Sequence, residues 1–197
     1  MSKADETKQY IIEKAAAIFN RHGYEGTSMS QLTAAIGKTK GAIYGNFKNK
    51  DEIAHAAFEH NLALVENQIT SIVSSRKHTC DKLIAFAGYY LDHFHSLLQK
   101  GGCPILNAAV DSDNSDLPIR ASVMRAVDNW LDSVTRIVNS GKRKEEIKAQ
   151  VDADEFASLF VSSIEGGILL SKVTGDQAHL ERVVNNLIDL VNNELRR

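Results

Sequence analysis

The stretch from Thr27 to Lys50, TSMSQLTAAIGKTKGAIYGNFKNK, decides how the first part of this chain folds. It predicts a short helix over residues 28–36, because apolar side chains recur there at the spacing of one helix face. Gly37 is expected to end that helix, since glycine adopts the left-handed C-terminal conformation at little cost. Thr39 can cap a second helix through its hydroxyl. Two short helices joined by a glycine turn are typical of a helix-turn-helix.

The second helix of this pair has two chemically different faces. Ile43 and Phe47 lie four residues apart and form its inner face. Its outer face carries small, polar or cationic side chains, namely Thr39, Lys40, Gly41, Ala42, Tyr44 and Asn46. Lys48 and Lys50 follow just beyond it. A short helix with such a face has the size and chemistry to enter a DNA major groove.

Over this region the sequence resembles the DNA-binding domain of TetR-family repressors. The resemblance is carried by AAAIFNRHGYEGTS at 15–28, LTAAIG at 32–37 and TKGAIYGNFKNKDEI at 39–53. The spacing Gly-x-x-Tyr-x-x-Phe-x-x-Lys, which begins at Gly41 and ends at Lys50, makes the match specific. Gly45 and Asn46 depart from the pattern of many members, which have an aromatic residue or a histidine there.

Together these observations give a set of expected DNA-contacting residues. The set is Thr27, Ser28, Thr39, Lys40, Gly41, Ala42, Tyr44, Asn46 and Lys50. Thr27 and Ser28 could offer hydroxyl or backbone N–H groups to phosphate. A capping role at the start of the first helix explains these two residues about as well.

Charge is divided unevenly along the 197 residues, whose formal net charge is −2. Residues 1–50 hold eight Lys and Arg against four Asp and Glu, whereas residues 51–197 hold 15 against 21. A basic head on an acidic body suits a protein that presents only its head to a polyanion. Chance clustering would explain the charge alone equally well, but together with the helix-turn-helix it favours DNA binding.

Composition excludes several classes of protein. An apolar content of 43% is enough for a core, and two prolines with 12 glycines argue against a disordered or fibrous chain. No apolar run reaches the roughly 18 residues that span a bilayer, and residues 1–14 lack the apolar segment of a signal peptide. We therefore expect a cytoplasmic protein without a membrane partner. Two cysteines do not make a disulfide framework.

Apolar spacing predicts helices through the rest of the chain and no strand. The expected helices span residues 5–22, 50–75, 80–100, 103–110, 119–140, 154–173 and 176–195. Residues 111–118, DSDNSDLP, predict a loop. The Gly166-Gly167 pair costs about 1 kcal/mol of helix propensity per glycine, and close approach of another helix is the usual compensation.

The expected fold is all-α, with a three-helix DNA-binding domain over residues 1–48 and a helical domain over residues 49–197. The resemblance implies a homodimer that pairs through its last two helices, a palindromic DNA operator and a small-molecule pocket in the body. The broad apolar faces of the last two helices and the Gly166-Gly167 pair support the same dimer. Candidate pocket residues are Phe86, Tyr90, Phe94, Cys103, Leu106, Asn107, Met124, Trp130 and Ile164. Each is equally acceptable as a core residue.

Other kinds of site find little support in the sequence. No nucleophile elbow, phosphate loop or paired-acid motif is present, so we expect neither enzymatic activity nor a cofactor. The histidines lack the spacing of a helical metal site. Cys103, beside Gly101-Gly102, would need exposure and a lowered pKa to act as a redox sensor.

The predicted function is that of a ligand-responsive DNA-binding transcriptional regulator, a repressor released from its operator by a small molecule. The alternative is a helical ligand-binding or interaction protein whose head no longer binds DNA. A salt-dependent shift assay on genomic DNA distinguishes the two.

Overall fold

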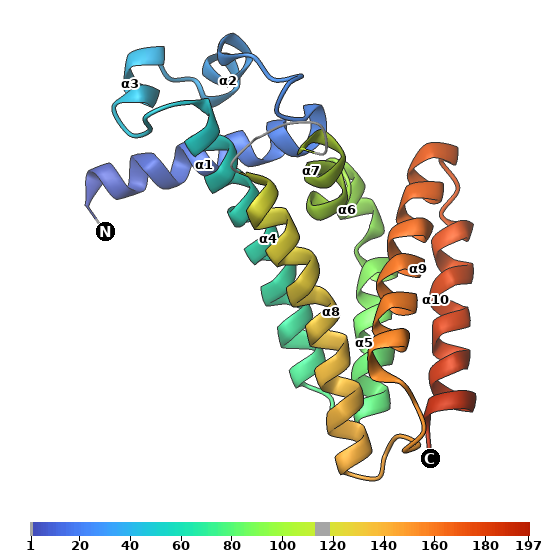
Figure 1. Cartoon of the computed structure of the whole chain (residues 1–197). Helices are drawn as coiled ribbons and strands as arrows, with labels where there is room; N and C mark the ends of the chain where they lie inside the picture. Colours follow the sequence, from blue (N-terminus) through green and yellow to red (C-terminus); the bar gives the residue numbers. More distant parts are fainter. Residues whose placement is uncertain (1, 113–118) are drawn as a thin grey trace. The chain divides into compact units, whose positions relative to one another are not determined.

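The computed structural model describes residues 2–112 and 119–197 of the chain. These residues form helices and one isolated backbone bridge but no strand, which confirms the predicted all-α class. The helices are α1 Lys3–His22, α2 Met29–Ile36, α3 Lys40–Tyr44, α4 Lys50–Ser74, α5 Thr79–Asp92, α6 Phe94–Gln99, α7 Pro104–Ser112, α8 Ile119–Arg143, α9 Ala153–Thr174 and α10 Ala178–Leu190 (Figure 1). A π-helical turn, η1 Val191–Leu195, follows α10 directly.

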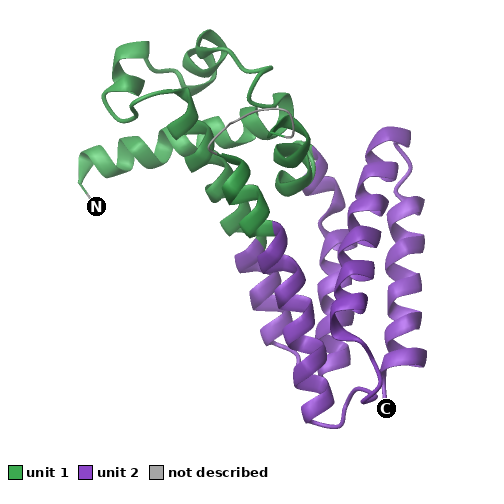
Figure 2. Ribbon diagram, in the orientation of Figure 1, with its two compact units in different colours: residues 1–65, 99–126 green, residues 66–98, 127–197 purple. Residues whose placement is uncertain are grey.

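The chain divides into two compact units (Figure 2). Unit 1 combines residues 1–65 with 99–126, and unit 2 combines residues 66–98 with 127–197. The helix-turn-helix therefore shares its unit with α7, although α7 follows it by about sixty positions in the chain. The division expected from the sequence, 1–48 and 49–197, follows chain order and stays a prediction about functional domains.

Unit 1 is built on the core of the helix-turn-helix. Its buried apolar residues include Ile11, Ala15 and Phe19 of α1, Leu32 and Ile36 of α2, Ile43 of α3, and Phe47, Ile53, Ala54 and Ala57. The predicted burial of Ile43 and Phe47 is confirmed, but α3 ends at Tyr44, so Phe47 follows the helix and does not belong to it. Burial of Ile43 leaves the opposite side of α3 exposed.

Unit 2 is a bundle in which α10 packs against α9 and α5 (Figure 1). A Cβ atom added at Gly167 would lie 3.2 Å from the Leu180 backbone and 3.3 Å from Val183, both on α10. Close approach of α10 therefore accounts for Gly167, as the sequence predicted. Gly166 differs, because a Cβ atom there would meet nothing within 4 Å.

Among the described residues, α9 is the one helix long and apolar enough to cross a membrane by length and composition alone. This corrects the expectation that no such run exists. Its buried side chains, which include Phe160, Ile164 and Ile168, belong to the core of unit 2. The core helix of a soluble protein passes the same test, so the finding is weak evidence for a membrane span.

The helix predicted over residues 80–100 is broken in the structure. His93 separates α5 from α6, with φ −106° and ψ 9°. Its Nδ1 lies 2.9 Å from the Tyr89 carbonyl oxygen, and its ring stacks on the Tyr89 ring at 4.4 Å between centroids. This local bonding to the preceding turn accompanies the interruption. In the predicted loop at 111–118, residues 111 and 112 belong to α7, and residues 113–118 lie outside the described residues.

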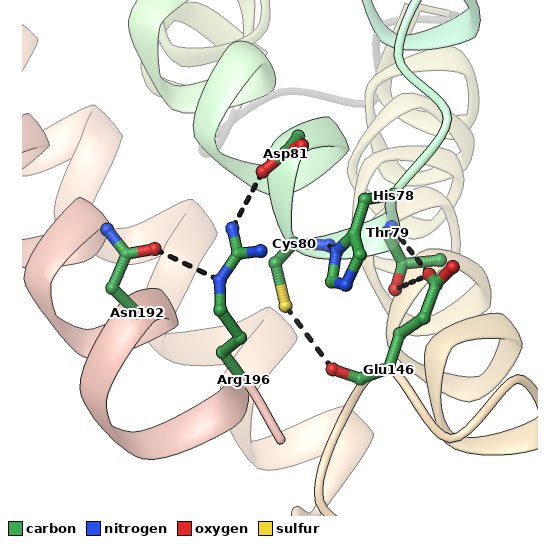
Figure 3. A network of polar contacts seen from close by, with 7 residues as sticks. All are labelled: His78, Thr79, Cys80, Asp81, Glu146, Asn192 and Arg196. Carbon is green, nitrogen blue, oxygen red and sulfur yellow. Dashed lines mark hydrogen bonds and ion pairs between the residues drawn. The ribbon is translucent and has the colours of Figure 1, made fainter.

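A polar network within unit 2 joins residues 192–196 and Glu146 to the start of α5 (Figure 3). The Arg196 guanidinium pairs with the Asp81 carboxylate at 2.7 Å and also donates to the Asn192 side-chain oxygen at 3.3 Å. Nearby, the Glu146 carboxylate accepts hydrogen bonds from the backbone N–H and the hydroxyl of Thr79, at 2.8 and 2.7 Å. These bonds tie η1 and the segment after α8 to the start of α5.

The Thr79–Glu146 contact predicts a pH-dependent stability. The two hydrogen bonds from Thr79 hold the pKa of the Glu146 carboxyl below its usual range. A carboxyl whose pKa is depressed by folding stabilises the protein above its unfolded pKa, about 4.3, and loses that contribution as the pH falls through the folded value. Thr79→Val removes the hydroxyl bond and keeps the shape. We therefore expect it to lower the free energy of unfolding at neutral pH, and to lower it less below pH ~4.

Urea unfolding of both proteins at several pH values measures this difference. A destabilisation of the same size at all pH values would show that Glu146 does not gain its stabilising charge from Thr79.

Candidate nucleic-acid interface

Two local motifs shape the helix-turn-helix. At the start of α2 the Ser28 hydroxyl accepts the Gln31 N–H at 3.2 Å, and the Gln31 side-chain oxygen accepts the Ser28 N–H at 2.7 Å. This reciprocal capping box satisfies two backbone donors at the helix end. Gly37 has φ 68° and ψ 27°, and its N–H donates to the Thr33 carbonyl at 3.0 Å. The predicted glycine turn between the helices is confirmed.

The second helix, α3, is five residues long and closed at both ends by side chains. The Thr39 hydroxyl accepts the Ala42 N–H at 3.2 Å, and the Asn46 side-chain amide donates to the Ala42 carbonyl at 2.9 Å. Of the predicted outer-face residues, Thr39, Lys40, Gly41, Ala42 and Tyr44 are exposed, and Asn46 is half-buried. A Cβ atom at Gly41 would meet nothing within 4 Å. The outer face is therefore open to a large ligand.

The structure places Thr27 differently from the rest of the predicted set. Thr27 is fully buried, and its hydroxyl donates to the Gly23 carbonyl at 2.6 Å. Its N–H lies 3.3 Å from the Tyr24 carbonyl oxygen. Both groups stabilise the turn before α2, so we leave Thr27 out of the proposed interface. Ser28 is exposed, but its hydroxyl serves the capping box.

Lys50 is held over an aromatic ring at the start of α4. Its Nζ lies 3.9 Å from the centroid of the Tyr24 ring, and the Tyr24 hydroxyl donates to the Asp51 carboxylate. Burial, together with this bond, raises the pKa of Tyr24 to about 12, so the phenol stays protonated and keeps donating. On α3, Lys40 lies 5.8 Å from the Tyr44 ring. Such cation–π contacts hold a lysine in place without neutralising its charge.

A second group of cations was not singled out from the sequence. Tyr10 of α1 is exposed, and the Nζ atoms of Lys14 and Lys38 lie 5.6 and 5.9 Å from its ring centroid. Lys38 directly follows Gly37 in the turn between α2 and α3. Its place in the predicted turn is the sequence signal that could have identified it. Lys14 lies on α1, and only the folded structure brings it to the same ring as Lys38. The two lysines extend the positive charge of unit 1 beyond α3.

Hydrogen bonds also join the end of α1 to the segment around α7, within unit 1. The Asn20 side-chain amide donates to the Lys100 and Gly102 carbonyls at 2.7 and 3.0 Å. The Asn107 side-chain amide donates to the Asn20 carbonyl at 3.0 Å. Asn107 was predicted to line a ligand pocket, but its amide is used in this contact. No local sequence pattern indicates bonds between residues this far apart in the chain.

The same contact brings two backbones close together. Gly101 has φ 105°, and a Cβ atom there would lie 2.5 Å from the Asn20 carbonyl oxygen, so the position requires glycine. The Asp111 carboxylate accepts the Tyr24 N–H from the turn after α1. A partly open pocket of about 40 Å³ lies between α1, α4 and α7, with Asn61 and Phe58 among its lining residues. That volume holds a few water molecules and is far below that of a ligand pocket.

The candidate ligand-binding residues separate into two groups. Phe86, Tyr90, Phe94, Trp130 and Ile164 belong to unit 2 and are buried. Cys103, Leu106, Asn107 and Met124 belong to unit 1. In unit 1, the Met124 side chain is 60% exposed, and Cys103 is buried. Cys103 therefore lacks the exposure that a redox-sensing thiol needs.

In unit 2 the aromatic members of the set are in contact. The Tyr90 ring stacks on the Trp130 ring at 5.4 Å and on the Phe86 ring at 6.4 Å between centroids. Phe86 also makes an edge-to-face contact with Phe160 of α9 at 5.4 Å. These rings form a continuous aromatic row, defined here as Trp130, Tyr90, Phe86 and Phe160.

Comparison with known proteins gives matches along the whole chain. Family models for "Bacterial regulatory proteins, tetR family" and "Tetracyclin repressor-like, C-terminal domain" match residues 11–57 and 79–187. A solved TetR-family transcriptional regulator from Cytophaga hutchinsonii is 34% identical, with a TM-score of 0.93 over 100% of this chain and 98% of its own. The HTH-type transcriptional regulator YxaF of Bacillus subtilis is 25% identical over 97% of this chain and 98% of its own. The HTH-type transcriptional repressor DhaR of a Mycobacterium species is 21% identical, over 89% and 87%.

Proposed function

The chain belongs to the TetR family of DNA-binding transcriptional regulators, and we propose that it is a repressor that binds a palindromic operator as a homodimer. A small molecule bound in the helical body weakens that binding. The proposed site of action is the bacterial cytoplasm, where the DNA is. One relative, DhaR, carries the name of a transcriptional repressor, which supports repression over activation.

The open outer face of α3 is the observation that carries DNA binding. Both ends of α3 are closed by side chains, so the helix keeps its shape without a partner. Its exposed face holds small residues at Gly41 and Ala42, which allow close approach to base edges. Lys40 and Lys50 flank this face with positive charge, each next to an aromatic ring. Phosphate contacts from such lysines set the register, while the smaller residues lie near bases.

An unpartnered apolar stripe on α9 supports the homodimer. Apolar residues on one side of the helix are exposed, namely Leu159, Leu169, Leu170 and Val173. Gly166 lies on the same side and is half-buried, and a Cβ atom there would meet nothing within 4 Å. The Val173 side chain is 76% exposed. They recur at three- and four-residue spacing, so they form one face. A second copy of the same helix, related by a two-fold axis, would cover this stripe on both chains.

Titration of salt against DNA affinity tests the proposed docking. Fragments selected from the protein's own genome provide the operator. Lys50→Ala is expected to weaken binding to all sequences and to reduce the slope of log K against log salt by about one. Lys144→Ala, an exposed lysine of unit 2, is the matched control and should leave both unchanged. An unchanged slope with Lys50→Ala would exclude Lys50 from the interface.

The same assay separates the proposal from its alternative. A helical ligand-binding or interaction protein with an inactive head would shift no genomic fragment even at low salt. If the effector lowers the affinity of the protein for operator DNA, operator DNA must lower the affinity of the protein for the effector by the same factor. Equal ligand affinity with and without operator would refute release by the effector.

A further inference from the structure

Trp130 carries a buried polar group without a protein partner. Its side chain is only 7% exposed, and no group of the described residues hydrogen-bonds its Nε1–H. An indole nitrogen can only donate, so it needs an acceptor. A buried donor without an acceptor costs free energy, and native structures keep few of them.

Two other buried polar side chains of unit 2, Tyr89 and Ser171, are hydrogen-bonded within the protein. The Tyr89 hydroxyl donates to the Gln68 side-chain oxygen at 2.7 Å. The hydroxyl of the fully buried Ser171 accepts the Leu180 N–H at 2.9 Å. Trp130 differs from these residues, although it lies in the same unit and is equally well covered.

The indole packs against one end of a row of aromatic rings. Trp130 stacks on Tyr90 with 27° between the ring planes, and Tyr90 stacks on Phe86 with 16°. Ile164 of α9 is fully buried in the same unit. Aromatic rings favour offset contact with another ring. A charge brought among them would lose its hydration without compensation.

We propose that the Nε1–H of Trp130 anchors the effector, which is an uncharged planar compound with a hydrogen-bond acceptor at its edge. The acceptor takes the indole hydrogen bond, and the ring of the compound packs along the aromatic row. This inference rests on the proposed ligand-responsive function and names the chemical class of its ligand.

Quinoline and naphthalene form a matched probe pair for the full-length protein. They have the same shape, but quinoline has a ring nitrogen acceptor where naphthalene has a C–H. A net hydrogen bond is worth a factor of about five to ten in affinity, so quinoline should bind tighter by that factor in calorimetry. Trp130 is the single tryptophan of the chain. A protein labelled with ¹⁵N at the indole nitrogen therefore gives one indole resonance, which quinoline should move downfield and naphthalene should not.

Two variants assign the effect to the indole N–H. Trp130→Phe keeps a ring and removes the donor, and it should bind the two probes equally. Tyr89→Phe removes a different buried polar group of the same unit and should keep the preference for quinoline. If Trp130→Phe does not fold, the indole resonance of the wild-type protein decides.

Equal affinities in the wild type, an unmoved indole resonance, or no binding of either probe would overturn the inference. None of these results depends on DNA. A protein that releases operator with some other effector but treats both probes alike refutes the Trp130 anchor and keeps the repressor function. A protein that prefers quinoline but shifts no DNA keeps the anchor and refutes the repressor.

Discussion

The substitution Leu170→Glu is expected to separate the protein into monomers at micromolar concentration. Leu170 is 50% exposed within the apolar stripe of α9, with Leu169 and Val173 beside it on the same face. In a dimer paired through that stripe, a glutamate would bring a carboxylate into an apolar contact without a partner. Changing a hot-spot residue near the centre of an interface costs about 2 kcal/mol or more, so with Leu170 in that role the dissociation constant should rise about thirtyfold or more.

Sedimentation of the wild type and the variant over a range of concentrations measures this constant. Leu64→Glu is the matched control, because Leu64 of α4 is 40% exposed and lies outside the stripe. Thermal melting shows whether the chain still folds. A large residue at Gly167 is a poor probe of the dimer, since that glycine packs against Leu180 and Val183 of its own chain.

A wild-type chain that sediments as a monomer would refute the homodimer. An intact dimer of Leu170→Glu would place the interface elsewhere. If the dimer dissociates, operator affinity should fall with it, because a palindrome presents two half-sites about 34 Å apart and a monomer reads only one.

Gly41→Glu is expected to abolish operator binding while leaving the chain folded. Gly41 lies on the exposed face of α3, where an added Cβ atom would meet nothing within 4 Å. Replacing an exposed helical glycine even favours the helix, by about 0.5 to 1 kcal/mol. On DNA, however, the glutamate would bring a negative charge and extra volume into the groove between two rows of phosphates. We expect the affinity for operator to fall by about a hundredfold or more, because the substitution disrupts the contact of both recognition helices in the dimer.

Fluorescence anisotropy with labelled operator measures this loss, and thermal melting reports the stability of the same samples. Gln150→Glu makes the same change of charge at an exposed residue of unit 2 and should leave binding unchanged. Operator binding by Gly41→Glu at wild-type affinity would mean that α3 does not enter the groove.

The sequence by itself determined the helix-turn-helix and most of the helices, because the physical signals for them are local. Gly37 ends α2 through a backbone conformation that glycine adopts cheaply. Ser28 and Thr39 cap α2 and α3 through hydrogen bonds that reach only three residues. Ile43 and Phe47 lie four residues apart, and the Phe47 N–H still donates to the Ile43 carbonyl oxygen although α3 ends at Tyr44, so both side chains face the core. Every one of these is a property of neighbouring residues.

Tertiary structure alone decided the features that depend on residues distant in the chain. Thr27 looks like a phosphate ligand in the sequence, but the fold buries it under the turn before α2. The sequence does not distinguish Gly166 from Gly167. Only the position of α10 shows that Gly167 allows close packing, whereas Gly166 has open space beside it. Asn107 was predicted to line a ligand pocket, but in the structure its side-chain amide donates to the backbone carbonyl of Asn20 on α1. The packing of the helices decides which polar and small residues make contacts within the protein and which remain free to contact a ligand. Helical periodicity in the sequence does not determine which helices pack together.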